Sequence, residues 1–520
     1  MKLKKIKYSL IYMLLILFMG ACSLEENPSF PSEETLFNNR EGLETVLNGC
    51  YSSVANYNYY GADFHYLTDM SSGLYNTNRD GSLKDIAALN PPASLNFVEN
   101  VWKAFYITIA RSNDLISGVA GSALADESEI NDILGQAYFL RSFTYFNLVR
   151  LYGKGPLITE KITSSTINYP MSTSEEIYAQ VIADAEKAYE LLSSSGFDME
   201  GRPNQFAAKM LLTKVYMTLA GNGTAGETEY WQKAYDEAIQ VYGEFNLVPD
   251  YRTLWFEETS NNTGESIFEV QANIENTLNL IQIFTASSGV KGRTTWGRLK
   301  PNLEVYDLHD VTYPEDPRFH ATFHTEWTKY KANGSTSIQK TYPKFKKRNN
   351  KDNSYPWSYK YYAKDHTIIN FNSNMNLVVY RYADLLLMLA EIENELNGPE
   401  NAYQYVNEVL ARARQSADIP SVEPQDWSGM TQEEFRVAIM HEYQFELLTE
   451  GQDWFTLRRR GYEYYKTNVI DVHNNHPKYD FTILRDVEYP DNDRIMLMPI
   501  PASEITANPN ISANDQNLGY

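Results

Sequence analysis

Amphipathic segments with a helical period recur along most of this 520-residue chain, and they constrain its fold more than any other feature. Apolar side chains return every three to four positions in residues 41–54, 98–116, 129–152, 173–192, 204–220, 229–242, 376–396, 400–415 and 431–459. Because a strand would need strict alternation, this spacing predicts helices. The sequence therefore predicts a mainly α fold, assembled from helices of similar length.

Successive helical segments are of a size that suits pairing. The segment 173–192 has Ser172 or Thr173 as an N-cap, with Glu175 and Glu176 in its first turn. Bulky aromatic residues in one segment are matched by alanines in another, such as Ala234. This pattern is typical of tetratricopeptide-like helix pairs, although the repeat signature is loose.

Three regions lack the helical period. Residues 56–92 are rich in Tyr, Asn, Gly and Asp, and we expect a long surface excursion there, of the kind that is usually functional or disordered. Residues 261–369 mix short apolar stretches with Gly, Pro and aromatic residues, which predicts an irregular region with a few short strands. Residues 486–520 are irregular and contain several prolines, and we expect them to wrap back onto the body.

The N-terminus reads as a lipoprotein signal. Four lysines in residues 2–7 precede an apolar run over residues 10–19, and Gly20 and Ala21 stand directly before Cys22. The run is shorter than the ~20 residues that a membrane-spanning helix needs, which disfavours a plain membrane anchor. The sequence predicts a signal peptide over residues 1–21, an acylated Cys22, and a polar tether over residues 22–32 that holds the mature protein at a membrane surface.

Composition excludes several classes of function. A net charge of −22 disfavours binding to nucleic acid, whose phosphates need a basic surface. If Cys22 is acylated, Cys50 is the remaining cysteine, so no internal disulfide can form and a closed zinc site is improbable. We predict no metal and no cofactor. The 39 tyrosines and 8 tryptophans join apolar faces to polar edges, which favours recognition of amphipathic ligands such as sugars.

Three short motifs only imitate known sites. Residues 221–226 match GxGxxG but follow a predicted helix where a dinucleotide site needs a strand, so they indicate a turn between helices. Residues 76–87 begin like a calcium loop but end in Ala87 where a glutamate is required. His441 and Glu442 begin a zinc-protease pattern whose second histidine is replaced by Phe445.

Two pairs of glutamates lie four residues apart on helical faces. Glu391 and Glu395 are expected near Arg381, and Glu442 and Glu446 near the arginines at 458–460. Buried charge networks that fix helix packing are the commoner use of such groups, so we interpret both pairs as structural. A pair of carboxylates could also serve a surface glycoside hydrolase or lyase, which stays as an alternative.

Several stretches carry the motifs of one known family: Phe139-Leu-Arg with Tyr145-Phe and residues 153–157, Arg381-Tyr-Ala-Asp with Ala390 to Asn394, Glu442 to Arg458, and residues 499–520 with Pro499-Ile-Pro and the closing Gly519-Tyr520. With these stretches the chain resembles the SusD/RagB family of outer-membrane nutrient-uptake lipoproteins, over almost the whole mature length. Tyr443, Gln452 and Thr456 depart from the family pattern, which puts a local ion-pair pattern in doubt.

The resemblance implies a SusD-like helical scaffold with four tetratricopeptide-like helix pairs and an irregular ligand-bearing region with a few short strands. It implies one body over residues 33–520, with helices in about 33–260 and 376–485, ligand-bearing loops in about 261–375, and the tail at 486–520. Family members bind glycans, or in some cases peptides, without turnover, as lids on a SusC-like TonB-dependent transporter. Glu25 and Glu26 resemble export cues, which implies an outer-membrane protein facing the cell exterior. A scaffold for assembly or adhesion, binding protein alone, is a further alternative.

No family motif carries a binding residue, so we predict the glycan site from two aromatic-rich loop regions, residues 56–92 and 286–370. The predicted stacking platforms are Trp296, Trp357, Tyr57, Tyr60 and Tyr75, the predicted hydroxyl partners are Asn58, Asp80 and Arg298, and the second choices are Trp327, Tyr359 and Tyr362. For each ring, packing against its own scaffold is the competing interpretation. A basic cluster, Lys344, Lys346, Lys347, Arg348 and Lys351, is either a solvated loop or a contact for an acidic glycan.

Overall fold

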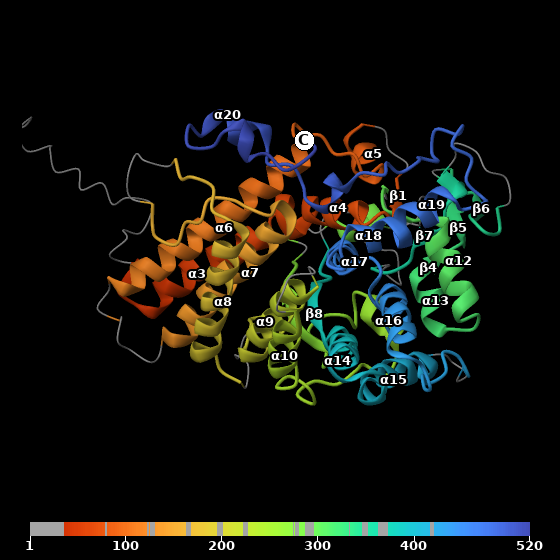
Figure 1. The fold of residues 1–520 in the computed structure, drawn as a ribbon, viewed down its shortest axis with the longest axis horizontal. Helices are drawn as coiled ribbons and strands as arrows, with labels where there is room; N and C mark the ends of the chain where they lie inside the picture. Colours follow the sequence, from red (N-terminus) through yellow and green to blue (C-terminus); the bar gives the residue numbers. More distant parts are fainter. Residues whose placement is uncertain are drawn as a thin grey trace, which may run out of the picture.

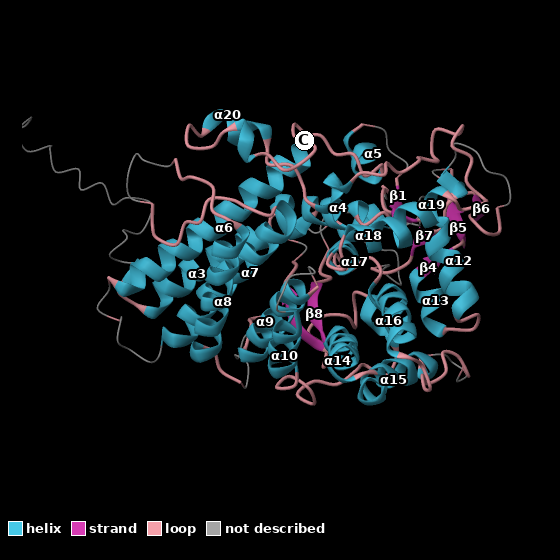
Figure 2. Cartoon of the chain, in the orientation of Figure 1, coloured by secondary structure: helices cyan, strands magenta, loops and turns pink. Residues whose placement is uncertain are grey.

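The fold is seen in a computed structural model of the whole chain. The structure describes residues 36–77, 81–121, 124, 130–162, 168–194, 201–221, 227–273, 275, 280–285, 296–331, 333–345, 352–361, 373–416 and 421–520. Helices dominate these residues and the strands are short (Figure 2), which confirms the predicted mainly α class.

Four helix pairs stack side by side and form the scaffold (Figure 1). The pairs are α3 (Arg40–Val54) with α6 (Asn96–Ala120), α7 (Asn131–Tyr152) with α8 (Ser174–Leu191), α9 (Gln205–Ala220) with α10 (Glu227–Ala238), and α14 (Tyr382–Asn397) with α15 (Pro399–Gln415). Each pair contacts the next through α6 and α7, α8 and α9, and α10 and α14. The four tetratricopeptide-like pairs are thus confirmed.

Local sequence signals explain where the helices begin and end. Thr173 caps α8 in a capping box, in which its side chain accepts from the Glu176 N–H and the Glu176 carboxylate accepts from the Thr173 N–H. Helix α7 ends at Gly153, whose φ of 74° lies in the left-handed region. A Cβ there would also lie 2.7 Å from a methyl carbon of Leu497, so the tail packs directly against this turn.

Residues 56–92 are not the surface excursion that their polarity predicts. They form the short helices η1 (Tyr57–Gly61), α4 (Asp63–Ser71) and α5 (Ser82–Ala87) and the strand β1 (Tyr75–Asn76), and all nine residues of α4 are buried. Their polar side chains find partners far away in sequence: Asp69 accepts from the Gly451 N–H, and Asn76 donates to Tyr355 Oη and the Arg485 carbonyl. Such partners allow polar groups to be buried.

Residues 261–369 carry short strands, as expected, but also short helices. The elements of this region are β2 (Ser266–Val270), α11 (Ile281–Thr285), β3 (Lys300–Pro301), α12 (Leu303–Thr312), α13 (Pro317–Thr322), β4 (Phe323–His324), β5 (Glu326–Tyr330), β6 (Thr336–Lys340) and β7 (Trp357–Ser358). Four antiparallel pairs occur in the described residues: β1 with β3, β2 with β8 (Leu377–Arg381), β4 with β7, and β5 with β6. The β1–β3 and β2–β8 pairs connect this region to other parts of the chain, whereas β4–β7 and β5–β6 lie within it.

Two predicted helices are interrupted. The segment 376–396 begins as strand β8, because residues 377–381 pair with β2, and becomes helix α14 only from Tyr382. The segment 431–459 divides into α16 (Gln432–Leu447) and α17 (Asp453–Arg458), since Thr449 and Gly451 both adopt positive φ. Apolar periodicity continues across both breaks and therefore conceals them.

The C-terminal tail runs back over α6 and the end of α7. The Met498 N–H donates to the Leu151 carbonyl and the Ala502 N–H to the Ala93 carbonyl, and α20 (Ala502–Ala507) lies above α6 in Figure 1.

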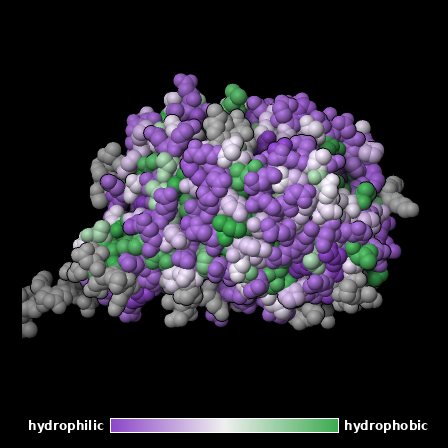
Figure 3. All heavy atoms as spheres, turned by 60° about the horizontal axis from the view of Figure 1, so that its bottom comes forward, coloured by the Kyte–Doolittle hydropathy of each residue, from purple (hydrophilic) through white to green (hydrophobic). Residues whose placement is uncertain are grey.

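The remaining short elements are η3 (Tyr251–Trp255), η4 (Asp352–Ser354), α18 (Tyr462–Tyr465), η5 (Lys466–Ile470), α19 (Asp471–Asn474), η6 (Asp493–Met496) and η7 (Ala513–Asp515). The face shown in Figure 3 is mainly hydrophilic, with apolar residues in small patches.

Within the described residues, no helix combines the length and apolar character needed to span a membrane. The segment with the predicted lipidation site, Cys22, lies outside these residues.

Candidate ligand-binding site

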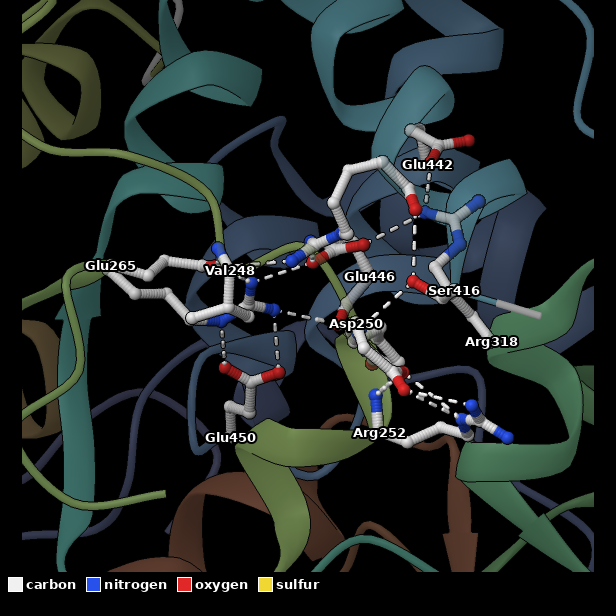
Figure 4. Close-up of polar contacts among 12 residues, drawn as sticks. Val248, Asp250, Arg252, Glu265, Arg318, Ser416, Glu442, Glu446 and Glu450 are labelled. Atoms are coloured by element: carbon white, nitrogen blue, oxygen red, sulfur yellow. Dashed lines mark hydrogen bonds and ion pairs between the residues drawn. The ribbon is translucent and has the colours of Figure 1, made fainter. Parts of the chain in front are cut away.

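The glutamates of α16 belong to a buried charge network and not to a cleft (Figure 4). Arg318 Nη1 lies 2.6 Å from Glu442 Oε1 and 2.9 Å from Glu446 Oε2, and all three side chains are fully buried. Burial opposes the ionisation of Glu446, but three arginines, Arg412 foremost, outweigh it and hold its pKa well below the usual range. The structural interpretation of this pair is supported, because both carboxylates are fully buried and ion-paired, Glu446 with three arginines and Glu442 with Arg318.

The predicted arginine partners are exchanged between the two glutamate pairs. Arg381 does not pair with Glu391; it binds Glu446 on α16, with Nη1 2.6 Å from Oε1. Glu391 instead binds Arg459 and Arg460, whose Nη1 and Nη2 atoms lie 2.6 Å and 2.5 Å from its Oε1. Spacing along a helix showed which side chains share a face but not which helix that face meets.

Tyr443 has a clear role at its unusual position. Its hydroxyl donates to Glu391 Oε2 at 3.0 Å. A neutral donor thus completes this network beside Arg459.

Two of the predicted platforms are core residues. Tyr75 is 0% exposed and donates to Asp453 Oδ2 at 2.7 Å, and Tyr60 is 4% exposed and stacks on Phe143 with ring centres 5.8 Å apart. Neither ring offers a face to a ligand. The prediction is wrong for both, because the segment that carries them folds into the interior.

Trp357 is likewise buried, at 1% exposed, and it supports a neighbouring loop instead of binding a ligand. A Cβ added to Gly297 would lie 1.7 Å from Trp357 Cζ3, so the ring packs directly beneath this glycine. Lys300 Nζ lies 4.1 Å from the ring centre, and Trp327, itself buried, meets the ring edge-on at 5.7 Å. The indole therefore holds the backbone between Trp296 and Arg298 in place.

Trp296, Arg298 and Tyr57, three of the predicted residues, are each partly exposed; Arg298 stacks on Trp296 and acts electrostatically on Tyr57, and we call these three residues the Trp296 cluster. The Arg298 guanidinium carbon lies 3.9 Å from the Trp296 ring centre, and Nη1 donates to Tyr66 Oη at 3.4 Å. Burial and then Asp63 raise the pKa of Tyr57, while the positive charge of Arg298 acts in the opposite direction. An indole beside a guanidinium and phenols suits a flat polar ligand.

Tyr57 also lines a cavity of about 450 Å³ between the end of α3 and strand β2. Tyrosine rings, polar side chains and a few apolar side chains line this cavity. The lining residues are Asn48, Tyr51, Ser52, Val54, Ala55, Asn56, Tyr57, Gly201, Arg202, Phe268, Glu269, Val270 and Gln271. The Arg202 guanidinium lies 4.6 Å from the Tyr51 ring centre and donates to Asn48 Oδ1 at 2.8 Å. Sequence reasoning missed this cavity, because its walls come from three separate segments and none carries a motif.

The other predicted residues are less informative. Asn58 is partly buried, and its N–H donates to Asn56 Oδ1 at 3.0 Å; Tyr359 is partly buried and stacks on His324, with ring centres 4.4 Å apart. Lys344 pairs with Glu326 at 3.2 Å. Asp80, Tyr362 and the rest of the basic cluster, Lys346, Lys347, Arg348 and Lys351, lie outside the described residues. No group of three or more His, Cys, Asp or Glu side chains in the described part of the chain could hold a metal ion.

Comparison with models of protein families assigns the chain to one family. The model of the SusD family matches residues 231–520, more than half of the chain. The chain belongs to the SusD family. A second model, described as starch-binding associating with outer membrane, matches residues 24–217 of this SusD-family chain.

Relatives of this SusD-family protein align over its whole length. The SusD-like protein P2 of Formosa agariphila is 29% identical over 541 residues, covering 99% of this chain and 100% of the relative. The SusD-like protein P25 of the same organism is 25% identical, with the same coverage.

Solved structures share the fold. A SusD homolog from Bacteroides thetaiotaomicron superposes with a TM-score of 0.77 at 23% identity, covering 94% of this chain and 98% of that one. A second structure, determined with xylogluco-oligosaccharide, superposes with a TM-score of 0.71 at 19% identity, covering 90% and 97%.

Proposed function

We propose that this SusD-family protein is a surface lipoprotein that binds oligo- or polysaccharide and delivers it, unchanged, to a SusC-like TonB-dependent transporter in the outer membrane. The observation that carries the proposal is the Trp296 cluster. It joins an indole, a guanidinium and a phenol at the surface, and the cavity beside Tyr57 adds further tyrosine and amide groups.

The chemistry of this surface fits a sugar. The C–H face of a sugar ring packs against an aromatic ring, and each Å² of apolar surface removed from water contributes roughly 25 cal/mol. Hydroxyl groups of the sugar can accept from Arg298 and exchange hydrogen bonds with Tyr57. The entropy lost on association offsets part of the binding free energy from two or three such contacts. The remainder corresponds to dissociation constants on the order of millimolar to micromolar.

The proposed lack of turnover is supported by the state of the paired carboxylates. Glu442, Glu446 and Glu391 are buried and each is bound by at least one arginine, which supports a structural use of these groups over a role as acid or base on a glycosidic bond. Incubation with a panel of polysaccharides should release no reducing sugar. Release of sugar would favour the surface hydrolase or lyase instead.

The proposed location depends on Cys22 and on the family description that names association with the outer membrane. An acylated Cys22 followed by a polar tether would let the body move as a lid over the transporter. Purification of the anchored protein from its native membrane should bring down a TonB-dependent transporter. Recovery of the protein with no such transporter would contradict the proposed partnership and favour an assembly or adhesion scaffold.

Calorimetry of residues 23–520 against neutral glycans, acidic glycans and peptides tests the ligand class. We expect heat of binding with at least one glycan and none with the peptides. Binding of peptides alone would assign the protein to the peptide-capturing members and overturn the glycan proposal.

A further inference from the structure

Arg150, in the last turn of α7, differs from the other buried arginines. In the part of the chain that the structure describes, Arg141, Arg318, Arg381, Arg412 and Arg459 are buried and each forms an ion pair with a carboxylate. Arg150 is 5% exposed, and no described carboxylate lies within 4 Å of it. A buried charge without a partner carries a desolvation penalty of several kcal/mol, so this arrangement needs an explanation.

The contacts that Arg150 does make leave part of its guanidinium unused. The group lies between the rings of Phe146 and Phe455, 4.0 Å and 3.7 Å from their centres, and Nη2 donates to Asn147 Oδ1 at 2.5 Å. Nε is buried and has no hydrogen-bond acceptor. The helix dipole favours a cation at the end of α7, which accounts for the position of the residue but not for its unpaired donor.

A second cation without a described carboxylate partner lies beside it. Arg458 of α17 donates to the carbonyls of Arg150 and Met496, and its guanidinium stacks on Trp454 at 4.4 Å. Burial lowers the pKa of Arg458 to about 9, and the neighbouring charge of Arg150 contributes to the shift. The two arginines therefore create a local excess of positive charge in a chain whose net charge is −22.

Both arginines line one cavity of about 510 Å³, between α7, α8, α17 and the tail. Four cationic residues contribute to its wall, Arg150, Lys154, Arg458 and Arg459, of which Arg459 is already paired with Glu391, against the single carboxylate of Glu175. Glu175 is exposed at the first turn of α8, where its own backbone N–H and the neighbouring hydroxyls lower its pKa. A cavity of this size is within the range of small-molecule sites.

We propose that this cavity is a binding site for a small oxyanion of the carboxylate, sulfate or phosphate class. The planar fork of a guanidinium matches such groups in two parallel hydrogen bonds, and Arg150 and Arg458, which both line the cavity without a described carboxylate partner, supply the charge. Tyr178 and Ser174 also line the cavity and add hydroxyl donors. The site shares no residue with the Trp296 cluster, so it does not depend on the proposed glycan function.

Calorimetry of residues 23–520 in chloride buffer at constant ionic strength tests the site with three probes, inorganic sulfate, inorganic phosphate and glucuronate, and with glucose as the neutral control. We expect at least one of the anions to bind and glucose not to bind at this site. Binding of sulfate or phosphate alone would identify an inorganic anion site, and binding of glucuronate would extend it to acidic sugars. Failure of all three anions to bind would overturn the proposal.

Two variants that should change the anion affinity in opposite directions, compared with a distant control, separate binding at this site from general charge effects. Lys154→Ala should weaken anion binding by about twofold to fivefold and Glu175→Gln should tighten it by a similar factor, as for charges at a partly exposed rim. Lys187→Ala, at the other end of α8 with a side chain 47% exposed, is the matched control and should change nothing.

Arg150→Gln should abolish anion binding if the variant folds. Lys154→Ala and Glu175→Gln test the assignment of the site even if Arg150→Gln does not fold. Equal affinity in the wild type, Lys154→Ala and Glu175→Gln would show that the anion binds elsewhere and would overturn the assignment.

Discussion

Arg381 and Glu450 form a bidentate ion pair in the interior, with Arg381 Nε 2.7 Å from Glu450 Oε2 and Nη2 2.9 Å from Oε1. Arg381 ends strand β8 and Glu450 follows helix α16, so the pair joins the strand to the end of the helix. Burial opposes the ionisation of Glu450, but Arg381 and then Lys360 outweigh it and hold its pKa below the ordinary range. The pair thus fixes strand β8, and with it the start of helix α14, to the end of α16.

Arg381→Met should lower the free energy of unfolding by about 3–5 kcal/mol, because it leaves the carboxylates of Glu446 and Glu450 buried without this partner. Urea unfolding followed by circular dichroism measures the change. Arg252→Met is the control, since Arg252 pairs with Asp250 at 2.8 Å while 37% exposed, and we expect a loss below about 1 kcal/mol. Equal losses in the two variants would contradict a special role for the buried pair.

Asp453 should make stability depend on pH. Burial, and then the nearby carboxyl of Asp69, raise the pKa of Asp453 to about 7, above the value of about 3.9 in an unfolded chain. Between these two values the folded state binds more protons, so this group lowers the free energy of unfolding as pH rises from about 4 to 7.

Asp453→Asn should remove that contribution and still accept a hydrogen bond from Tyr75. The variant should therefore gain stability relative to the wild type on going from pH 5 to pH 8, as measured by urea unfolding at both values. Asp250→Asn, at a partly exposed position, should show no such gain. A pH-independent difference between Asp453→Asn and the wild type would be evidence against the raised pKa.

Trp296 and Trp357 should respond differently to truncation, a prediction that depends on the proposed glycan binding. Trp296→Ala should weaken glycan binding about tenfold, through loss of ~1–2 kcal/mol of ring contact, with little change in stability. Trp357→Ala should lower the free energy of unfolding by about 3–5 kcal/mol, because it removes a buried indole.

Trp357→Phe, which keeps a ring beneath Gly297, should recover part of that stability and most of the glycan affinity. Affinity gels measure the binding and urea unfolding the stability. Unchanged glycan affinity in Trp296→Ala would place the binding surface elsewhere.

Cys22→Ala should move the protein from the membrane fraction to the soluble fraction, since the proposed acyl anchor is lost. The released protein should still bind glycan but no longer support uptake. Cys50→Ala is the matched control: this thiol is buried, burial raises its pKa to about 12, and the variant should stay membrane-bound. Retention of Cys22→Ala at the membrane, or continued uptake, would contradict the lid proposal.

The helices were predictable because their signals are local. The capping residue Thr173, the glycine that ends α7 and the apolar period of each segment act within one or two turns of helix, and all are visible in the sequence. The breaks at residues 377–381 and 448–452 were not predictable, because pairing with β2 and positive φ angles override a period that continues through them.

The candidate site was predictable only in part. Trp296 and Arg298 are loop residues and Tyr57 begins η1, and all three are partly exposed, although about 240 positions separate Tyr57 from Trp296. The rings of Tyr60, Tyr75 and Trp357 have the same chemistry but lie in the interior. Composition identifies an aromatic side chain, but it does not show which of its faces will be covered.

By itself, the sequence determined the helical class of this protein, its family resemblance and the structural use of its paired glutamates, since these depend on spacing along the chain. The tertiary structure alone decided which arginine meets which glutamate, which aromatic rings remain partly exposed, and that Arg150 is buried without a described carboxylate partner. The physical reason is that burial and ion pairing are set by residues far apart in sequence, such as Arg381 and Glu450, which only the packing of distant segments brings within 3 Å.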